Sequence, residues 1–139
     1  MVGRLSASRR HGRKPLRAFG LWLAIGWALV ALVIYLSLTS HPIQTPGIEF
    51  GDKIGHFFAY FTLVFWFCQL YTARRHGAFF LLFVLMGVGL EFIQGQTSYR
   101  TFQLADMAAN TLGALGGWGL VSLGGDGWLL RVERHLPRG

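Results

Sequence analysis

The chain of 139 residues is 53% hydrophobic and only 14% charged, whereas about 25% of the residues in a typical soluble domain are charged. This composition argues against an ordinary soluble protein and favours a membrane protein, and the length favours one domain. The net charge of +7 would suit either a nucleic acid or a membrane surface, so the positions of the basic residues must decide between them.

The first predicted element is a hydrophobic helix over residues 18–38. This run carries no charge, and at 1.5 Å per residue it would span about 30 Å, the thickness of one hydrocarbon core. It is longer than the apolar part of a cleaved signal peptide, so we expect the helix to be retained. A basic arm, residues 1–17, precedes the helix, and a loop with Pro and Gly, residues 40–51, follows it.

Three further apolar segments follow, over residues 55–71, 78–94 and 104–123. A short basic turn, residues 72–77, joins the first two of these segments, and a polar loop, residues 96–103, joins the last two. The final residues, 124–139, read as a polar tail. We therefore predict an all-α integral membrane protein in which residues 18–123 form a four-helix transmembrane bundle.

Basic residues are concentrated in the arm, the second loop and the tail. These segments hold all of the 13 Lys and Arg residues except Lys53 and Arg100. Because Lys and Arg in short loops favour the cytoplasmic side, both termini are predicted to be cytoplasmic. The same pattern explains the arm as an anchor on anionic membrane lipids. No nucleic-acid partner is expected, since the arm has no interleaved aromatic residues and no recognisable binding module.

Ionisable and amide side chains occur within or beside the three later segments, near the ends that are predicted to face away from the cytoplasm. They are Asp52, Lys53, His56 and Tyr60 around the start of the second segment, Glu91 and Gln94 in the third, Arg100 in the loop, and Asp106 and Asn110 in the fourth. Spacings of three or four residues place the members of each helix on one face. Because exposing charge to hydrocarbon is unfavourable, we expect these side chains to face one another inside the bundle.

Two of these residues are predicted to be direct partners. The second and third segments are joined by a tight turn, so they must pack antiparallel. Glu91 and His56 lie at nearly equal distances from that turn, about 26 Å along their helices. In a low dielectric, the carboxylate and the imidazole would form an ion pair or share a proton. Arg100 and Lys53 are the alternative partners of Glu91.

Small residues predict where the helices approach each other closely. In the fourth segment, Ala109, Gly113 and Gly117 recur every four residues. Such a face lets two helix backbones come together in a membrane. Gly87 and Gly89 are candidates for the same role in the third segment.

Together these motifs resemble the VanZ-like family, which is named for a membrane protein linked to teicoplanin resistance. The family pattern D-K-x-x-H-F-x-x-Y, E-x-x-Q, a loop Arg and D-x-x-x-N-x-x-G is matched here by Asp52, Lys53, His56, Phe57, Tyr60, Glu91, Gln94, Arg100, Asp106, Asn110 and Gly113. The match covers about residues 51–117. The resemblance implies a small multi-pass protein of the bacterial cytoplasmic (inner) membrane, with a role in the cell envelope or in glycopeptide resistance. It implies no mechanism.

Three interpretations of the polar residues stay open. The first is a binding site for a lipid or cell-envelope headgroup, such as a lipid-linked cell-wall precursor or a glycopeptide. In that site Lys53 and Arg100 would pair with phosphate or carboxylate groups. Its members would be Asp52, Lys53, His56, Tyr60, Glu91, Gln94, Arg100, Asp106 and Asn110. The second interpretation is a purely structural network that ties three helices together through hydrogen bonds.

The third interpretation is an enzyme that acts on a lipid-linked substrate. His56 would be the general base, Asp52 or Asp106 would orient it, and Glu91 would be the general acid. No serine or cysteine nucleophile stands near these residues, because Cys68 lies deeper in its segment. A metal held by His56, Glu91 and Asp106 lacks the spacing of any common metal motif, so we predict no metal and no cofactor.

Overall fold

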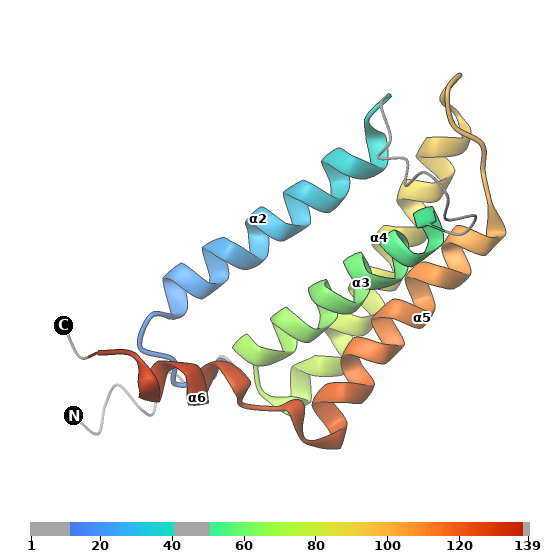
Figure 1. Ribbon diagram of the computed structural model, residues 1–139. Coiled ribbons are helices and arrows are strands. Elements are labelled where there is room, and N and C mark those ends of the chain that lie inside the picture. The colour runs from blue at the N-terminus through green and yellow to red at the C-terminus, as the bar shows by residue number, and fades with distance from the viewer. Residues whose placement is uncertain (1–11, 41–50, 138–139) are drawn as a thin grey trace.

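The computed structural model describes residues 12–40 and 51–137, which fold into a bundle of helices (Figure 1). In chain order the elements are α2 (Phe19–Leu38), α3 (Gly51–Leu70), α4 (Ala73–Gly95), α5 (Leu104–Leu120), η1 (Val121–Gly125) and α6 (Trp128–His135). This part of the chain contains no β-strand, and one isolated antiparallel bridge joins Arg13 to Tyr71. The prediction of an all-α fold is confirmed.

The four long helices alternate in direction, and α3 lies at the centre of the contacts among them. It packs most extensively against α5, and both of these helices contact α4. α2 lies along α3 and α4 on the other side, and α6 crosses the end of the bundle at which α2 begins (Figure 1). We call the end that carries α6 the basic end. We call the opposite end, where α3 and α5 begin, the polar end.

The core follows from the central place of α3. Its side chains Leu63, Val64 and Cys68 are completely buried, and Phe67 is 2% exposed. Aromatic rings from α4 and α2 pack around Phe67, with Phe83 at 5.2 Å and Trp27 at 5.7 Å between ring centroids. Because the free thiol of Cys68 lies in this apolar interior, it acts as a small hydrophobic side chain.

Two helices, α2 and α4, are long and apolar enough to cross a membrane by length and hydropathy. In a soluble protein such helices would be buried in the core. Here only 11% of the 18-residue apolar stretch of α2, and 28% of that of α4, is buried. Large apolar side chains such as Trp27 and Leu85 point outward, with exposed fractions of 57% and 59%. A surface of this kind is typical of contact with lipid.

The helix bounds correct three details of the sequence analysis. α3 begins at Gly51, so Asp52 and Lys53 are helical residues and not part of a loop. The carboxylate of Asp52 is favourable in this first turn because the helix dipole is positive there. α4 begins at Ala73, so Arg74 and Arg75 lie in its first turn and only two residues connect it to α3. The loop residues 41–50 and the arm before Gly12 lie outside the described residues.

The third correction concerns the tail, which we expected to be polar and without an element of its own. It forms the helix α6 after a widened turn, η1, in which Gly124 has a φ of 120°. α6 is amphipathic: Leu129 is completely buried and Glu133 is 5% exposed, while Arg131 and Arg134 are exposed. A helix of eight residues is too short to be stable alone, so its contacts with the bundle must hold it.

Candidate functional site

Glycines on α5 set the depth at which this helix meets α3. A Cβ atom at Gly113 would lie 2.0 Å from the carbonyl oxygen of Phe57, and one at Gly117 would lie 2.4 Å from that of Phe61. No other residue fits at these two positions, so the predicted close approach of α5 is confirmed there. Ala109, the first residue of the predicted small-residue face, is only partly buried. The approach places the two polar residues one and two turns earlier on α5 directly against the start of α3.

Gly87 on α4 has a similar role, whereas Gly89 does not. A Cβ atom at Gly87 would lie 3.1 Å from the ring of Tyr60 and 3.2 Å from Asn110, while one at Gly89 would meet nothing within 4 Å. Gly87 thus marks the point at which α4 touches both α3 and α5. Gly89 faces outward, contrary to the sequence-based expectation.

The first part of the site is a network of charged groups between α3 and α5. Asp106, whose side chain is 7% exposed, lies between two side chains of α3: Lys53 Nζ is 3.2 Å from Oδ1, and His56 Nε2 is 3.8 Å from Oδ2. Lys53 also lies 3.5 Å from Asp52. On its other side, His56 Nδ1 donates to Asn110 Oδ1 at 3.0 Å. The predicted spacing on both helices thus brings these five residues together.

A residue that the sequence analysis did not single out connects this network to α4. The backbone N–H of Gln103 donates to Glu91 Oε1 at 2.6 Å, and the side-chain oxygen of Gln103 accepts from Lys53 Nζ at 3.1 Å. Gln103 directly precedes α5. Its position at the end of the polar loop, next to Asp106, was the available signal, but nothing in the sequence indicated that its backbone would face Glu91.

The predicted direct pair of Glu91 and His56 is wrong. In the described residues, no hydrogen bond or ion pair joins the two side chains, because Glu91 accepts from Gln103 and His56 lies between Asn110 and Asp106. Equal depth along two antiparallel helices places two residues at the same level of the bundle. It does not place them on facing sides, and here the start of α5 supplies partners to both.

The second part of the site involves the last turn of α2, whose carbonyl groups have no partners within their own helix. Gln94 Nε2 donates to the carbonyl oxygen of Ser37 at 2.6 Å, and Tyr99 Oη donates to that of Leu38 at 3.0 Å. Arg100 Nη2 donates to that of Leu36 at 3.3 Å. Gln94 is therefore engaged in holding α2, although we predicted that it would face a ligand.

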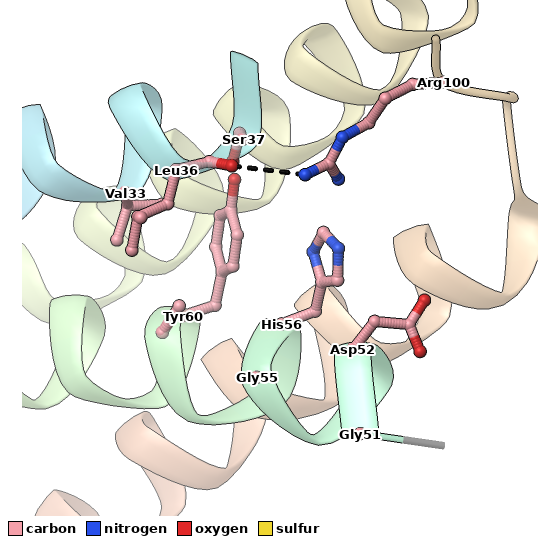
Figure 2. Close-up of a pocket in the computed structure, with 10 residues that line it drawn as sticks. Val33, Leu36, Ser37, Gly51, Asp52, Gly55, His56, Tyr60 and Arg100 are labelled. Carbon is pink, nitrogen blue, oxygen red and sulfur yellow. Dashed lines mark hydrogen bonds between the residues drawn. The ribbon is translucent and has the colours of Figure 1, made fainter. Parts of the chain in front are cut away.

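A cavity of about 250 Å³ lies between these two parts, at the polar end. Its wall combines Val33, Leu36 and Ser37 of α2 with Gly51, Asp52, Gly55, His56, Ala59 and Tyr60 of α3, and with Arg100 from the loop. Figure 2 shows the guanidinium group of Arg100 pointing toward the ring of His56 across this space. Of the nine predicted site residues, Lys53, Glu91, Gln94, Asp106 and Asn110 do not line the cavity.

Arg100 is the cation in the wall of the cavity with unused donors. Its Nε atom is buried and has no hydrogen-bond partner, and its Nη2 atom makes only the long bond to Leu36. Asp106 Oδ1 is also without a well-aligned hydrogen bond, but the charge of Lys53 lies 3.2 Å from it. A buried guanidinium donor that is left open is costly, and a bound anion would satisfy it.

Comparison with known proteins identifies the group to which this arrangement belongs. Residues 7–125 match the profile of the VanZ/LLP1 family. The chain belongs to the VanZ/LLP1 family. The resemblance that was drawn from the motifs of α3, α4 and α5 is thereby confirmed, and the match also takes in α2 and η1. Membership of the VanZ/LLP1 family and the two apolar helices together indicate a membrane protein.

One curated relative is an uncharacterised protein of Schizosaccharomyces pombe. It is 39% identical over an alignment of 91 residues, which covers 61% of this chain and 56% of the relative. The chain thus spans about half the length of the curated relative it matches. No solved structure matches the chain. The VanZ/LLP1 match therefore identifies the family of the chain but no activity, so a function has to be inferred from the geometry of the site.

The environment of His56 bears on the acid–base role that the sequence analysis considered. Its Nδ1 is hydrogen-bonded to Asn110, and its Nε2 lies 3.8 Å from Asp106 Oδ2, so both ring nitrogens face groups of α5. A general base needs a nitrogen directed toward the reacting proton. The pairing therefore favours a role in which His56 links α3 to α5. In residues 12–40 and 51–137, no group of three His, Cys, Asp or Glu residues could hold a metal ion.

We expect a double-mutant cycle to distinguish the real partners of His56. His56→Ala and Asn110→Ala should each destabilise the protein, and the double mutant should cost about 0.5–1 kcal/mol less than the sum because the pair shares one hydrogen bond. His56→Ala and Glu91→Gln should couple more weakly, since no bond joins these two side chains and they are linked only through Gln103, Lys53 and Asp106. Unfolding in detergent measures all of these values. Equal coupling in both cycles would contradict this geometry.

Proposed function

We propose that this VanZ/LLP1 protein is a four-span membrane protein that binds an anionic headgroup of a membrane lipid in the cavity at its polar end. Arg100 would hold the anionic group, and Asp52, His56 and Tyr60 would contact the rest of the headgroup. Lys53, Glu91, Asp106 and Asn110 would not touch the ligand. They would hold α3, α4 and α5 in the arrangement that leaves the cavity open.

The single observation that carries this proposal is Arg100, a cation in the cavity wall whose buried Nε has no hydrogen-bond partner. Within the described residues, the other cation of the polar end is engaged, because Lys53 lies near two carboxylates and donates a hydrogen bond to the side-chain oxygen of Gln103. An arginine with a planar set of free donors suits a phosphate or a carboxylate group.

The shape of the cavity supports an amphiphilic ligand. Its α2 wall presents the apolar side chains of Val33 and Leu36, while its α3 wall presents Asp52 and His56. The space beside Gly55 in this wall is open, because a Cβ atom at that position would meet nothing within 4 Å. A lipid could place its charged group at Arg100 and its apolar part along α2. A free inorganic anion would leave the apolar wall without a partner.

The distribution of exposed apolar side chains supports four spans. α3 exposes Phe58 and α5 exposes Leu112, with fractions of 58% and 57% that equal those on α2 and α4. All four long helices therefore present an apolar outer face, as helices in lipid do. The cavity then lies near one membrane interface, where the charged groups of lipids are found.

Two similarities bear on the identity of the headgroup. A lipid-linked cell-wall precursor or a glycopeptide is suggested by the resemblance to a family named for teicoplanin resistance, and the bacterial inner membrane would be its location. The relative from Schizosaccharomyces pombe favours a broader class of ligand. A function that both proteins share would use a common anionic phospholipid, which does not depend on a bacterial cell wall.

Native mass spectrometry of the protein with its co-purified lipid tests the binding proposal. We expect the wild type to retain a lipid with an acidic headgroup. Arg100→Gln should weaken its retention about tenfold or more, because a charge-assisted hydrogen bond is lost. Gly55→Leu should also abolish retention, since the new side chain fills the cavity without a clash.

Gly89→Leu is the matched control, because a side chain at Gly89 also meets nothing within 4 Å but lies outside the cavity. It should leave lipid retention unchanged. Equal retention in Gly55→Leu would show that the cavity is not the binding site. A co-purified lipid that is chemically altered only by the wild type would move the assignment to an enzyme. Unfolding of both cavity variants would favour a structural network.

The topology is tested separately with a reporter that is active only outside the cytoplasm. Fused after Gly47 the reporter should be active, and fused after Gly77 it should be inactive, because Arg74 and Arg75 favour the cytoplasmic side. The described residues support this orientation, since the exposed arginines gather at the end that carries α6. The reverse pattern of reporter activity would show that the bundle has the opposite orientation in the membrane.

A further inference from the structure

The basic end carries a second set of groups that the proposed site does not use. Its exposed arginines are Arg13, Arg17, Arg74, Arg75, Arg131 and Arg134. In the described part of the chain, the acidic residues at this end are Asp126 and Glu133, and both are engaged. Asp126 pairs with Lys14, and Glu133 accepts three hydrogen bonds from the start of α2. The free charge of this end is therefore strongly positive.

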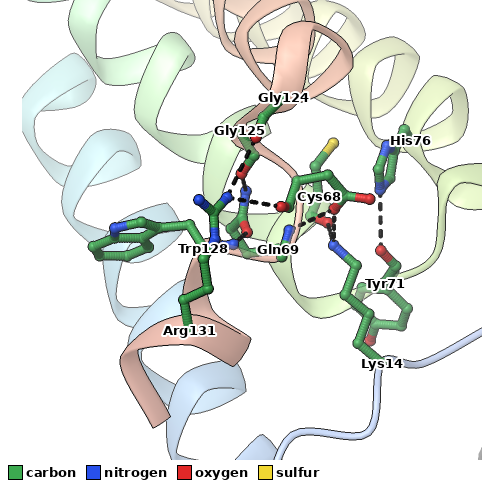
Figure 3. A network of polar contacts seen from close by, with 11 residues as sticks. Lys14, Cys68, Gln69, Tyr71, His76, Gly124, Gly125, Trp128 and Arg131 are labelled. Carbon is green, nitrogen blue, oxygen red and sulfur yellow. Dashed lines mark hydrogen bonds and ion pairs between the residues drawn. The ribbon is translucent and has the colours of Figure 1, made fainter. Parts of the chain in front are cut away.

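The segment from η1 to α6 is fixed in place against α3 by polar contacts (Figure 3). Gln69 donates to the carbonyl oxygen of Gly125 at 2.9 Å and accepts from the backbone N–H of Trp128 at 2.8 Å. Lys14 donates to the carbonyl oxygen of Cys68 at 2.8 Å and pairs with Asp126. With these bonds made, the orientation of α6 about its own axis is determined.

This orientation produces a mixed outer surface, which we call the α6 face and define by Leu123, Trp128, Arg131, Arg134 and Leu136. Leu123 is 89% exposed, and Trp128 and Leu136 are 43% and 48% exposed. Arg131 donates to the carbonyl oxygens of Gly124 and Asp126, and both of these bonds are exposed. Arg134 has no partner among the described residues.

We propose that the α6 face lies in the headgroup layer of the membrane and binds the phosphate groups of anionic phospholipids. The apolar side chains would reach the top of the acyl chains, and the arginines would pair with the phosphates. α6 crosses the end of the four long helices (Figure 1), which is where a membrane surface must lie if these helices span it. A nucleic acid would match the charge but would leave Leu123 and Leu136 exposed to water.

Nanodiscs of phosphatidylcholine that contain phosphatidylglycerol provide the test, with the full chain reconstituted and its bound lipids counted by native mass spectrometry. Gly55→Leu is used as the background, so that a lipid in the cavity does not contribute. Arg134→Gln should lower the retention of phosphatidylglycerol relative to phosphatidylcholine about fivefold, the effect expected for one arginine near an anionic surface. Folding should be unaffected, because Arg134 is exposed.

Arg74→Gln is the matched control, since it removes the same charge from the same end of the bundle but away from α6. If the α6 face is the binding surface, this variant should change the preference for phosphatidylglycerol less than about twofold, a smaller effect than one arginine in contact with the lipid would have. Equal losses in the two variants would indicate a general effect of net charge and overturn the proposal. The absence of any loss in Arg134→Gln would also overturn the proposal. The same holds if the chain forms a dimer that this variant dissociates, because the α6 face would then bind a second copy.

A second measurement does not depend on the arginines. Phosphatidylglycerol with brominated acyl chains quenches tryptophans that lie near the top of the chains. Trp128 should account for a quenched component that is missing in Trp128→Phe. If the quenching of the two proteins is the same, Trp128 lies away from the lipid and the α6 face is not in the headgroup layer.

Discussion

Replacing Gly113 with alanine is expected to prevent α5 from packing against α3. The added methyl group would lie 2.0 Å from the carbonyl oxygen of Phe57 and 2.8 Å from its carbonyl carbon. Both are backbone atoms inside a helix, so neither can move aside, and the two helices must separate. We expect a loss of about 3 kcal/mol or more in the free energy of unfolding. Thermal or chemical unfolding in detergent measures this loss.

Gly119→Ala is the control for this prediction, because it changes the same residue type on the same helix where a Cβ atom would meet nothing within 4 Å. That variant should be neutral or stabilising by about 0.5–1 kcal/mol, since alanine favours a helix over glycine. If Gly113→Ala is as stable as Gly119→Ala, α5 does not approach α3 as closely as described. The arrangement of Asp106 and Asn110 against α3 would then also lose its support.

Glu133→Gln is expected to release α6 from the start of α2. The carboxylate accepts from the backbone N–H of Arg17 at 2.6 Å, from that of Ala18 at 2.9 Å, and from Trp22 Nε1 at 2.7 Å. It also lies at the positive end of the α2 dipole. A glutamine would turn one acceptor into a donor facing other donors. We expect a loss of about 2–4 kcal/mol in the free energy of unfolding at neutral pH.

The effect of this substitution should depend on pH. Burial opposes ionisation of Glu133, but the hydrogen bonds from Ala18, Arg17 and Trp22 outweigh it and hold the pKa of this carboxyl below its ordinary value of 4.5. Because the folded pKa is the lower one, the carboxylate contributes its full stability above pH 4.5. That contribution is lost as the pH falls through the folded pKa. The melting temperatures of wild type and Glu133→Gln should therefore converge in acid.

Arg134→Gln is the control, because Arg134 is the neighbour of Glu133 and has no partner in the described residues. Its melting temperature should follow that of the wild type at every pH. A difference between wild type and Glu133→Gln that stays constant from pH 7 into acid would show that the charge of Glu133 is not what holds α6.

Contacts at both ends of α2 connect the prediction for Glu133 to the site. Glu133 satisfies the free N–H groups at its start, while Gln94, Tyr99 and Arg100 satisfy the free carbonyl groups at its end. Such caps matter because α2 buries only Gly26, Val30 and Ser37. If an anion draws Arg100 away from Leu36, it removes one of the bonds that hold the wall of the cavity.

The sequence by itself determined the four long helices and the level at which the polar residues meet. A charge-free run fixed α2 almost to the residue, since it was expected over residues 18–38 and observed over Phe19–Leu38. The spacing of Asp52 and His56 on one helix, and of Asp106 and Asn110 on another, placed each pair on one face. Hydrophobic length and helical periodicity are properties of a single segment, so they can be read without a fold.

Only the tertiary structure decided which polar groups are partners. Glu91 and His56 lie at one level, but the close approach of α5 at Gly113 brings Asp106 and Asn110 to His56 instead. Glu91 instead accepts a hydrogen bond from the backbone N–H of Gln103, at the end of the loop that leads into α5. Rotation of each helix about its axis depends on contacts with all its neighbours, and no single segment encodes it.

The same reason explains why the sequence did not reveal α6 as an element held by the bundle. A segment of eight residues is too short to form a stable helix by itself. The helix is stabilised by the burial of Leu129 and by the bonds of Glu133 to α2, more than a hundred positions earlier in the chain. Contacts between residues so far apart exist only once the four long helices have packed.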